Sequence, residues 1–151
     1  MKRFFAMPLV ALTFAAFVSQ AAAKTARPIS VGSWTGSWTC VAGKDKYTET
    51  FAPMLNGKAM RVVITGPFAS EGIAVYDKAR KAWFYAYINA DGTYSANTGP
   101  VSGANIAFKQ VFPAGIAVDT IAMNSATKYT SSFTMVANKK KVTSVEACTK
   151  N

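Results

Sequence analysis

Apolar and polar residues alternate along most of the chain beyond residue 30, with the two-residue period of a half-buried β-strand. β-Branched and aromatic residues are abundant in these runs, and turn-forming residues recur about every eight to twelve positions. No run keeps helical spacing beyond a turn or two. The pattern predicts about ten short strands. We expect them over residues 32–40, 46–52, 58–65, 70–76, 82–88, 104–112, 116–123, 127–136 and 142–148, with one more that contains Tyr94 and ends at the break Thr98-Gly99-Pro100.

Two turns indicate how neighbouring strands pair. Asn56-Gly57 is a strong type I′ hairpin signal. A two-residue loop there places Glu49 opposite Ile64 and leaves Arg61 on the other face of the sheet. A symmetric turn at residues 89–92 places Tyr94 opposite Tyr87, on one face with the remaining aromatic residues of that strand. Both faces of the strand 82–88 are apolar, so alternation leaves open which one faces inward.

The two cysteines, Cys40 and Cys148, lie near the ends of this series of strands. We expect them to form a disulfide, the alternative being two free thiols. Because a disulfide requires Cα atoms within about 7 Å, it places the first and last strands side by side. Short connections favour antiparallel neighbours. The sequence therefore predicts an all-β, single antiparallel up-and-down barrel of about ten strands, with a β-sandwich as the alternative.

The first 23 residues have the pattern of a signal peptide. Lys2 and Arg3 precede an uncharged, mostly apolar run over residues 4–18, and Ala21-Ala22-Ala23 offers small residues for cleavage. A membrane anchor would need about 20 apolar residues, and this run is shorter. We therefore expect cleavage near Ala23, a single domain over residues 24–151 without a transmembrane segment, and a periplasmic or secreted protein.

Composition excludes several kinds of function. Removing Lys2 and Arg3 lowers the net charge of +10 by two, and the remaining basic residues are scattered. The chain contains no histidine, so histidine-based catalysis, zinc sites with histidine ligands and histidine-ligated haem are excluded. No phosphate-binding glycine loop or dinucleotide motif is present. We expect no metal, no cofactor and no nucleic-acid partner.

Several short motifs resemble those of lipocalin-like (calycin-type) barrels. Gly32-Ser33-Trp34, repeated as Gly36-Ser37-Trp38, resembles the Gly-x-Trp of their first strand. A longer series of residues resembles exported bacterial proteins that are grouped as a domain of unknown function with this fold. The series comprises Glu49 with Phe51 and Pro53, Glu71-Gly72, Tyr76-Asp77, Trp83 and Asp91-Gly92-Thr93-Tyr94. The resemblance implies a barrel and an internal pocket, and it implies no chemistry.

The predicted function is non-enzymatic binding of a small apolar or amphipathic ligand, hydrophobic or anionic. The candidate ligand-binding residues are Glu49, Arg61, Trp83, Tyr85, Tyr87 and Tyr94. One alternative is an envelope structural or interaction protein whose barrel is filled by its own side chains. Another is a carboxylate-based hydrolase, in which Glu49 or Glu71 meets a second polar or acidic group. If Trp34 and Trp38 close one end of the barrel, we expect the site at the other.

Overall fold

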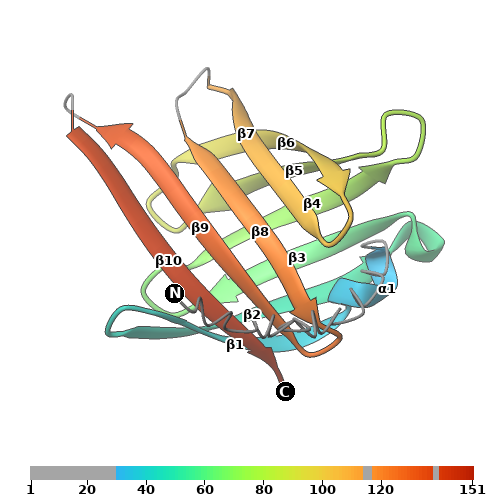
Figure 1. Ribbon diagram of the computed structural model, residues 1–151, viewed down its shortest axis with the longest axis horizontal. Coiled ribbons are helices and arrows are strands. Elements are labelled where there is room, and N and C mark those ends of the chain that lie inside the picture. The colour runs from blue at the N-terminus through green and yellow to red at the C-terminus, as the bar shows by residue number, and fades with distance from the viewer. Residues whose placement is uncertain (1–29, 114–116, 138–139) are drawn as a thin grey trace, which may run out of the picture.

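The protein is a closed barrel of ten antiparallel strands, as the sequence predicts (Figure 1). The structure is a computed structural model and describes residues 30–113, 117–137 and 140–151. Each strand pairs with its neighbours in the chain, and the last pairs with the first. The strands are β1 (Gly36–Ala42), β2 (Asp45–Met54), β3 (Ala59–Thr65), β4 (Ser70–Asp77), β5 (Ala82–Asn89), β6 (Tyr94–Ser102), β7 (Asn105–Phe112), β8 (Val118–Ser125), β9 (Lys128–Ala137) and β10 (Lys140–Lys150).

The predicted disulfide is confirmed, and it lies where the barrel closes. Cys40 of β1 pairs with Cys148 of β10 in the antiparallel ladder, and the two Cα atoms are 4.1 Å apart. Both side chains are buried. A disulfide is compatible with an exported protein.

The expected signal peptide lies outside the described residues, and no described helix is both long and apolar enough to cross a membrane.

The opening segment differs from the expected strand. Val31–Trp34 forms a short helix, α1, and β1 begins only at Gly36. The backbone N–H of Ser30 donates to Ser33 Oγ (3.3 Å), and Trp38 Nε1 donates to the Trp34 carbonyl oxygen (2.7 Å). The second bond satisfies the Trp34 carbonyl oxygen, which in a strand would accept from a neighbouring strand. Figure 1 shows α1 at the end of the barrel where β1 begins, beside the connection between β2 and β3.

The pairing predicted for β2 and β3 is confirmed. Glu49 lies opposite Ile64, and Arg61 points away from the barrel interior. Asn56 and Gly57 both have positive φ, and the Lys58 N–H donates to the Leu55 carbonyl oxygen, as a type I′ turn requires. The turn lies where the sequence placed it, and its first three residues form the short 3₁₀ segment η1 (Leu55–Gly57).

The pairing predicted for β5 and β6 is wrong by one residue. Tyr94 lies opposite Ile88 rather than Tyr87. The connection is an odd-length loop, in which Gly92 has positive φ and the Asn89 N–H donates to the Thr93 carbonyl oxygen. Because side chains alternate between the faces, a shift of one residue moves Tyr94 to the outer surface.

The predicted break at Thr98-Gly99-Pro100 is also absent, since β6 continues to Ser102. Gly99 is needed there for close packing rather than for a turn. A Cβ atom at Gly99 would lie 2.7 Å from Ile106 Cγ2 of the neighbouring β7. The glycine thus allows side chains of the next strand to lie over the β6 backbone.

Candidate functional site

The barrel is hollow. It encloses a cavity of about 490 Å³, lined by side chains from all ten strands and from α1. Ten lining residues are aromatic: Trp34, Tyr47, Phe51, Phe68, Trp83, Tyr85, Tyr87, Phe108, Tyr129 and Phe133. Eight lining residues are polar or charged: Glu49, Ser70, Asn89, Asn97, Asp119, Ser131, Ser144 and Glu146. An apolar cavity with a small set of polar groups is the usual form of a small-molecule site.

The two ends of the cavity differ. At the α1 end, Trp34 is only 4% exposed and packs against Phe51 and Tyr129, with ring centroids 5.4 and 5.2 Å apart. At the other end, Phe68 and Val142 line the cavity while remaining 48% and 51% exposed. The cavity therefore reaches the surface at the end away from α1, where the β3–β4 connection lies. Trp38 is fully buried beside Tyr129, and it does not line the cavity.

Glu49 is a buried carboxyl group on the inner face of β2. It is 7% exposed, and its Oε2 accepts a hydrogen bond from the Tyr129 hydroxyl group of β9. Burial raises the pKa of Glu49 from its ordinary 4.5 to about 7. The Tyr129 hydrogen bond opposes this rise, and the negative charge of Asp119 adds to it. Glu49 can therefore change its protonation state near neutral pH.

Two further carboxyl groups face the same cavity. Asp119 of β8 accepts a hydrogen bond from the Ser131 hydroxyl group of β9, and burial raises the pKa of Asp119. Glu146 of β10 is partly buried, and burial alone raises the pKa of Glu146 to about 7. The cavity thus combines an aromatic wall with three acidic side chains from three different strands.

Two tyrosines of the cavity, Tyr85 and Tyr129, remain neutral across the physiological range. Burial raises the pKa of both Tyr85 and Tyr129, and the negative charge of Glu49 adds to each rise. Their hydroxyl groups are therefore available as hydrogen-bond donors and acceptors rather than as bases. Tyr85 of β5 and Tyr129 of β9 both line the cavity, so the two hydroxyl groups face one common interior.

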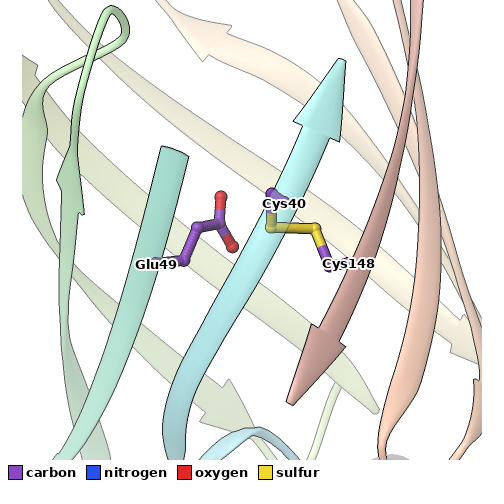
Figure 2. A group of neighbouring side chains, drawn as sticks. All are labelled: Cys40, Glu49 and Cys148. Carbon is purple, nitrogen blue, oxygen red and sulfur yellow. A yellow bond between two sulfur atoms is a disulfide. The ribbon is translucent and has the colours of Figure 1, made fainter. Parts of the chain in front are cut away.

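Glu49 also lies beside the disulfide. Figure 2 shows its carboxyl group pointing from β2 toward Cys40 and Cys148, and the ligand atoms of these three residues lie within 4.8 Å of one another. Tyr129 Oη is 3.5 Å from Cys40 Sγ. Such a group resembles a metal site by geometry alone. The sulfur atoms are bonded to each other, however, and metal coordination by cysteine requires thiolates.

The structure separates the six candidate residues into two sets. Glu49, Trp83, Tyr85 and Tyr87 line the cavity, so the inner face of β5 is the one that carries these aromatic rings. Arg61 and Tyr94 do not line it. The Arg61 Nε donates to Glu71 Oε1 (2.7 Å) on the outer surface, where both side chains are more than half exposed.

Tyr94 is 57% exposed and stacks on Phe112, with ring centroids 5.7 Å apart. Its outward position follows from the odd-length loop between β5 and β6. Glu71 likewise lies outside the cavity, so among the two glutamates considered for acid–base chemistry only Glu49 lies inside.

Sequence reasoning missed Asp119, Tyr129 and Glu146 as cavity residues. A signal for each of them was present in the alternation. Glu146 is two residues before Cys148 and therefore shares its inward face, and Tyr129 lies opposite Cys148 in the ladder. Asp119 alternates with Ile121 in the same way. This signal can be used only when the inward face of each strand is known, and the closed barrel determines that face.

The closed, antiparallel up-and-down barrel is consistent with a lipocalin-like fold. No protein family model and no curated protein matches the chain. The function must therefore be inferred from the residues of the cavity.

Proposed function

We propose that this is an exported, non-enzymatic binding protein that holds a small apolar or amphipathic molecule inside its barrel. The single observation that carries the proposal is the cavity of about 490 Å³. Ligand pockets commonly measure about 300–1,000 Å³ and combine apolar walls with a few polar groups. A structural protein with a filled barrel would have its own side chains in this space.

The site residues of the proposal are those that combine burial with access to the cavity. Glu49, Tyr85 and Tyr129 are among the lining residues that offer polar atoms to a ligand. Trp83 and Tyr87 provide flat apolar contact on the inner face of β5. A ligand would enter at the end away from α1, past Phe68 and Val142, because these lining residues are exposed there.

The proposed relationship is to exported bacterial proteins of unknown function with a lipocalin-like barrel. The Gly-x-Trp pair around Trp34 and Trp38 supports it, because both tryptophans lie at the closed end of the barrel. The disulfide supports export to the periplasm or beyond, since disulfides persist in oxidising compartments.

A carboxylate-based hydrolase is the second candidate, and it rests on Glu49 and Asp119 facing one cavity. The negative charge of Asp119 raises the pKa of Glu49, as in pairs that divide acid and base roles. Turnover of ester or glycoside substrates that is lost in Glu49→Gln would favour the hydrolase. Saturable binding without turnover favours the binding protein.

Filling the cavity tests the binding proposal directly. In Ala74→Phe, a ring replaces a buried methyl group of β4 that lines the cavity. We expect native mass spectrometry of wild-type protein from its host extract to show a bound small molecule, and Ala74→Phe to have lost it. Val75→Phe is the matched control, because Val75 is the next residue of β4 and faces outward, 37% exposed.

Both variants must first show unchanged cooperative unfolding, because an added ring in a packed wall can itself destabilise the fold. Wild-type protein that is repeatedly empty, with no thermal shift across a panel of lipids and metabolites, would contradict the proposed function.

A further inference from the structure

Charge is divided sharply between the inside and the outside of this barrel. The chain has 17 basic and 7 acidic residues, yet no lysine or arginine of the described residues lines the cavity. Three of the seven acidic residues do line it: Glu49, Asp119 and Glu146. A basic protein thus has an acidic interior. Burying carboxyl groups in an aromatic cavity is unfavourable unless they are paired.

The three carboxyl groups differ in what they contact. Glu49 accepts a hydrogen bond from Tyr129, and Asp119 accepts one from Ser131. Burial raises the pKa of Glu146, and the Glu146 carboxyl group has neither a hydrogen bond nor an ion pair to another described residue. Its carboxylate therefore keeps its acceptor capacity for a group inside the cavity.

A metal ion does not account for these carboxyl groups. Over residues 30–113, 117–137 and 140–151, the only cluster of potential metal-ligating atoms is Cys40, Glu49 and Cys148, which contains the disulfide. Glu49, Asp119 and Glu146 do not converge on one point in this way. Acidic groups distributed around an aromatic cavity fit an extended organic cation, because aromatic faces attract ammonium groups and carboxylates pair with them.

We propose that the ligand of the cavity is an amphipathic organic cation, an amine or quaternary ammonium compound with an aromatic or aliphatic body. Its positive group lies beside Glu146, whose carboxylate has no partner among the described residues, and is attracted by the other two cavity carboxylates, Glu49 and Asp119, while its apolar body packs on the aromatic wall. This inference rests on the proposed binding function and specifies its ligand class. It favours a cation over the anionic ligand that the basic surface suggested.

Three probes of nearly equal shape test the inference. They are a phenylalkyl trimethylammonium ion, the neutral compound with a tert-butyl group in place of the ammonium group, and the phenylalkyl sulfonate. Isothermal titration calorimetry at pH 8 is expected to show the tightest binding for the cation and the weakest for the sulfonate. A neutral or anionic probe that binds wild-type protein as tightly as the cation would overturn the inference and leave the binding function standing.

Charge-neutralising variants locate the cation. Glu146→Gln is expected to weaken binding of the trimethylammonium probe on the order of tenfold, with the neutral probe little affected. Glu49→Gln and Asp119→Asn should act in the same direction. Glu71→Gln is the matched control, because it removes a carboxylate from the outer surface. Unchanged cation affinity in all three cavity variants would overturn the proposal.

The pH dependence supplies an independent readout, since the trimethylammonium probe has no proton to lose. The ionisable groups that line the cavity are three carboxyl groups and the hydroxyl groups of Tyr47, Tyr85, Tyr87 and Tyr129. With the pKa values of Glu49 and Glu146 near 7, lowering the pH from 8 to 5.5 protonates both. Affinity should fall about 30-fold for one essential carboxylate.

A pH-independent affinity, or no binding by any of the three probes, also contradicts the cation inference. The proposed binding function is then judged separately by the extract experiment and Ala74→Phe. The two proposals can therefore fail independently.

Discussion

Replacing Cys40 and Cys148 together with alanine is expected to lower the free energy of unfolding by roughly 4 to 5 kcal/mol. The two residues are 108 positions apart, so the disulfide restricts nearly the whole described chain in the unfolded state. On the chain-entropy account, a loop of this length gains close to the largest stabilisation that one disulfide provides. Small domains are stable by about 5–15 kcal/mol in total, so the loss is a large share.

The folded barrel should survive this change. Five residue pairs join β1 to β10 in a continuous antiparallel register, and only one of them is the cysteine pair. Urea unfolding of oxidised wild type and of the double variant measures the effect, with circular dichroism confirming an unchanged β-sheet signal before the transition. Thr39→Ala with Thr149→Ala is the matched control, because this neighbouring pair lies in the same ladder. Superimposable unfolding curves for wild type and the cysteine variant would contradict the prediction.

Stability is also expected to fall as the pH rises from 5 to 8, which is the reverse of the behaviour of a protein held by surface carboxylates. Burial raises the pKa of Glu49 to about 7, whereas the unfolded chain has the ordinary value of 4.5. Between these values the folded protein holds a proton that the unfolded chain has released. The free energy of unfolding therefore decreases as the pH rises and levels off above about pH 7.

For Glu49 alone the decrease amounts to about 3 kcal/mol. Glu146 and Asp119 act in the same direction, since burial raises the pKa of each. The lowered pKa values of Glu71, Asp77 and Asp91 have the opposite sign, and their effect is confined to more acidic solution.

Glu49→Gln isolates the contribution of this one residue. The amide still offers an oxygen to the Tyr129 hydroxyl group, and it carries no charge at any pH. We expect the variant to be about 3 kcal/mol more stable than wild type at pH 8 and nearly equal to it at pH 5. Urea unfolding of ligand-free protein at both pH values measures this, with Glu71→Gln as the exposed control. A wild-type stability that rises with pH over this range, or a variant that follows wild type in parallel, would refute it.

Local chemistry was sufficient to predict much of the barrel. Alternation and turn residues indicated about ten strands, and Asn56-Gly57 set the pairing of β2 with β3, because an I′ turn admits only one register. The cysteine pair indicated which strands close the barrel. From this register alone, Glu49 and Arg61 were expected on opposite faces, and they are.

The turn after β5 shows where such reasoning fails. Asn89, Ala90, Asp91 and Gly92 are all acceptable turn residues, and nothing local distinguishes an even loop from an odd one. The difference of one residue decides whether Tyr94 is inside or outside. Local chemistry also did not indicate the helical turn Val31–Trp34. The Trp34 carbonyl oxygen accepts a hydrogen bond from the Trp38 indole of β1, which is a contact between two packed elements.

The sequence by itself determined the fold class, the strand count, the barrel closure at Cys40 and Cys148, and the absence of histidine chemistry. Only the tertiary structure decided that the barrel is hollow, that β5 turns Trp83, Tyr85 and Tyr87 inward, and that Asp119 and Glu146 join Glu49. The physical reason is that alternation assigns residues to two faces without naming the inner one. Closing ten strands into a barrel makes that choice for all of them together, and it brings carboxyl groups from β2, β8 and β10 to one cavity.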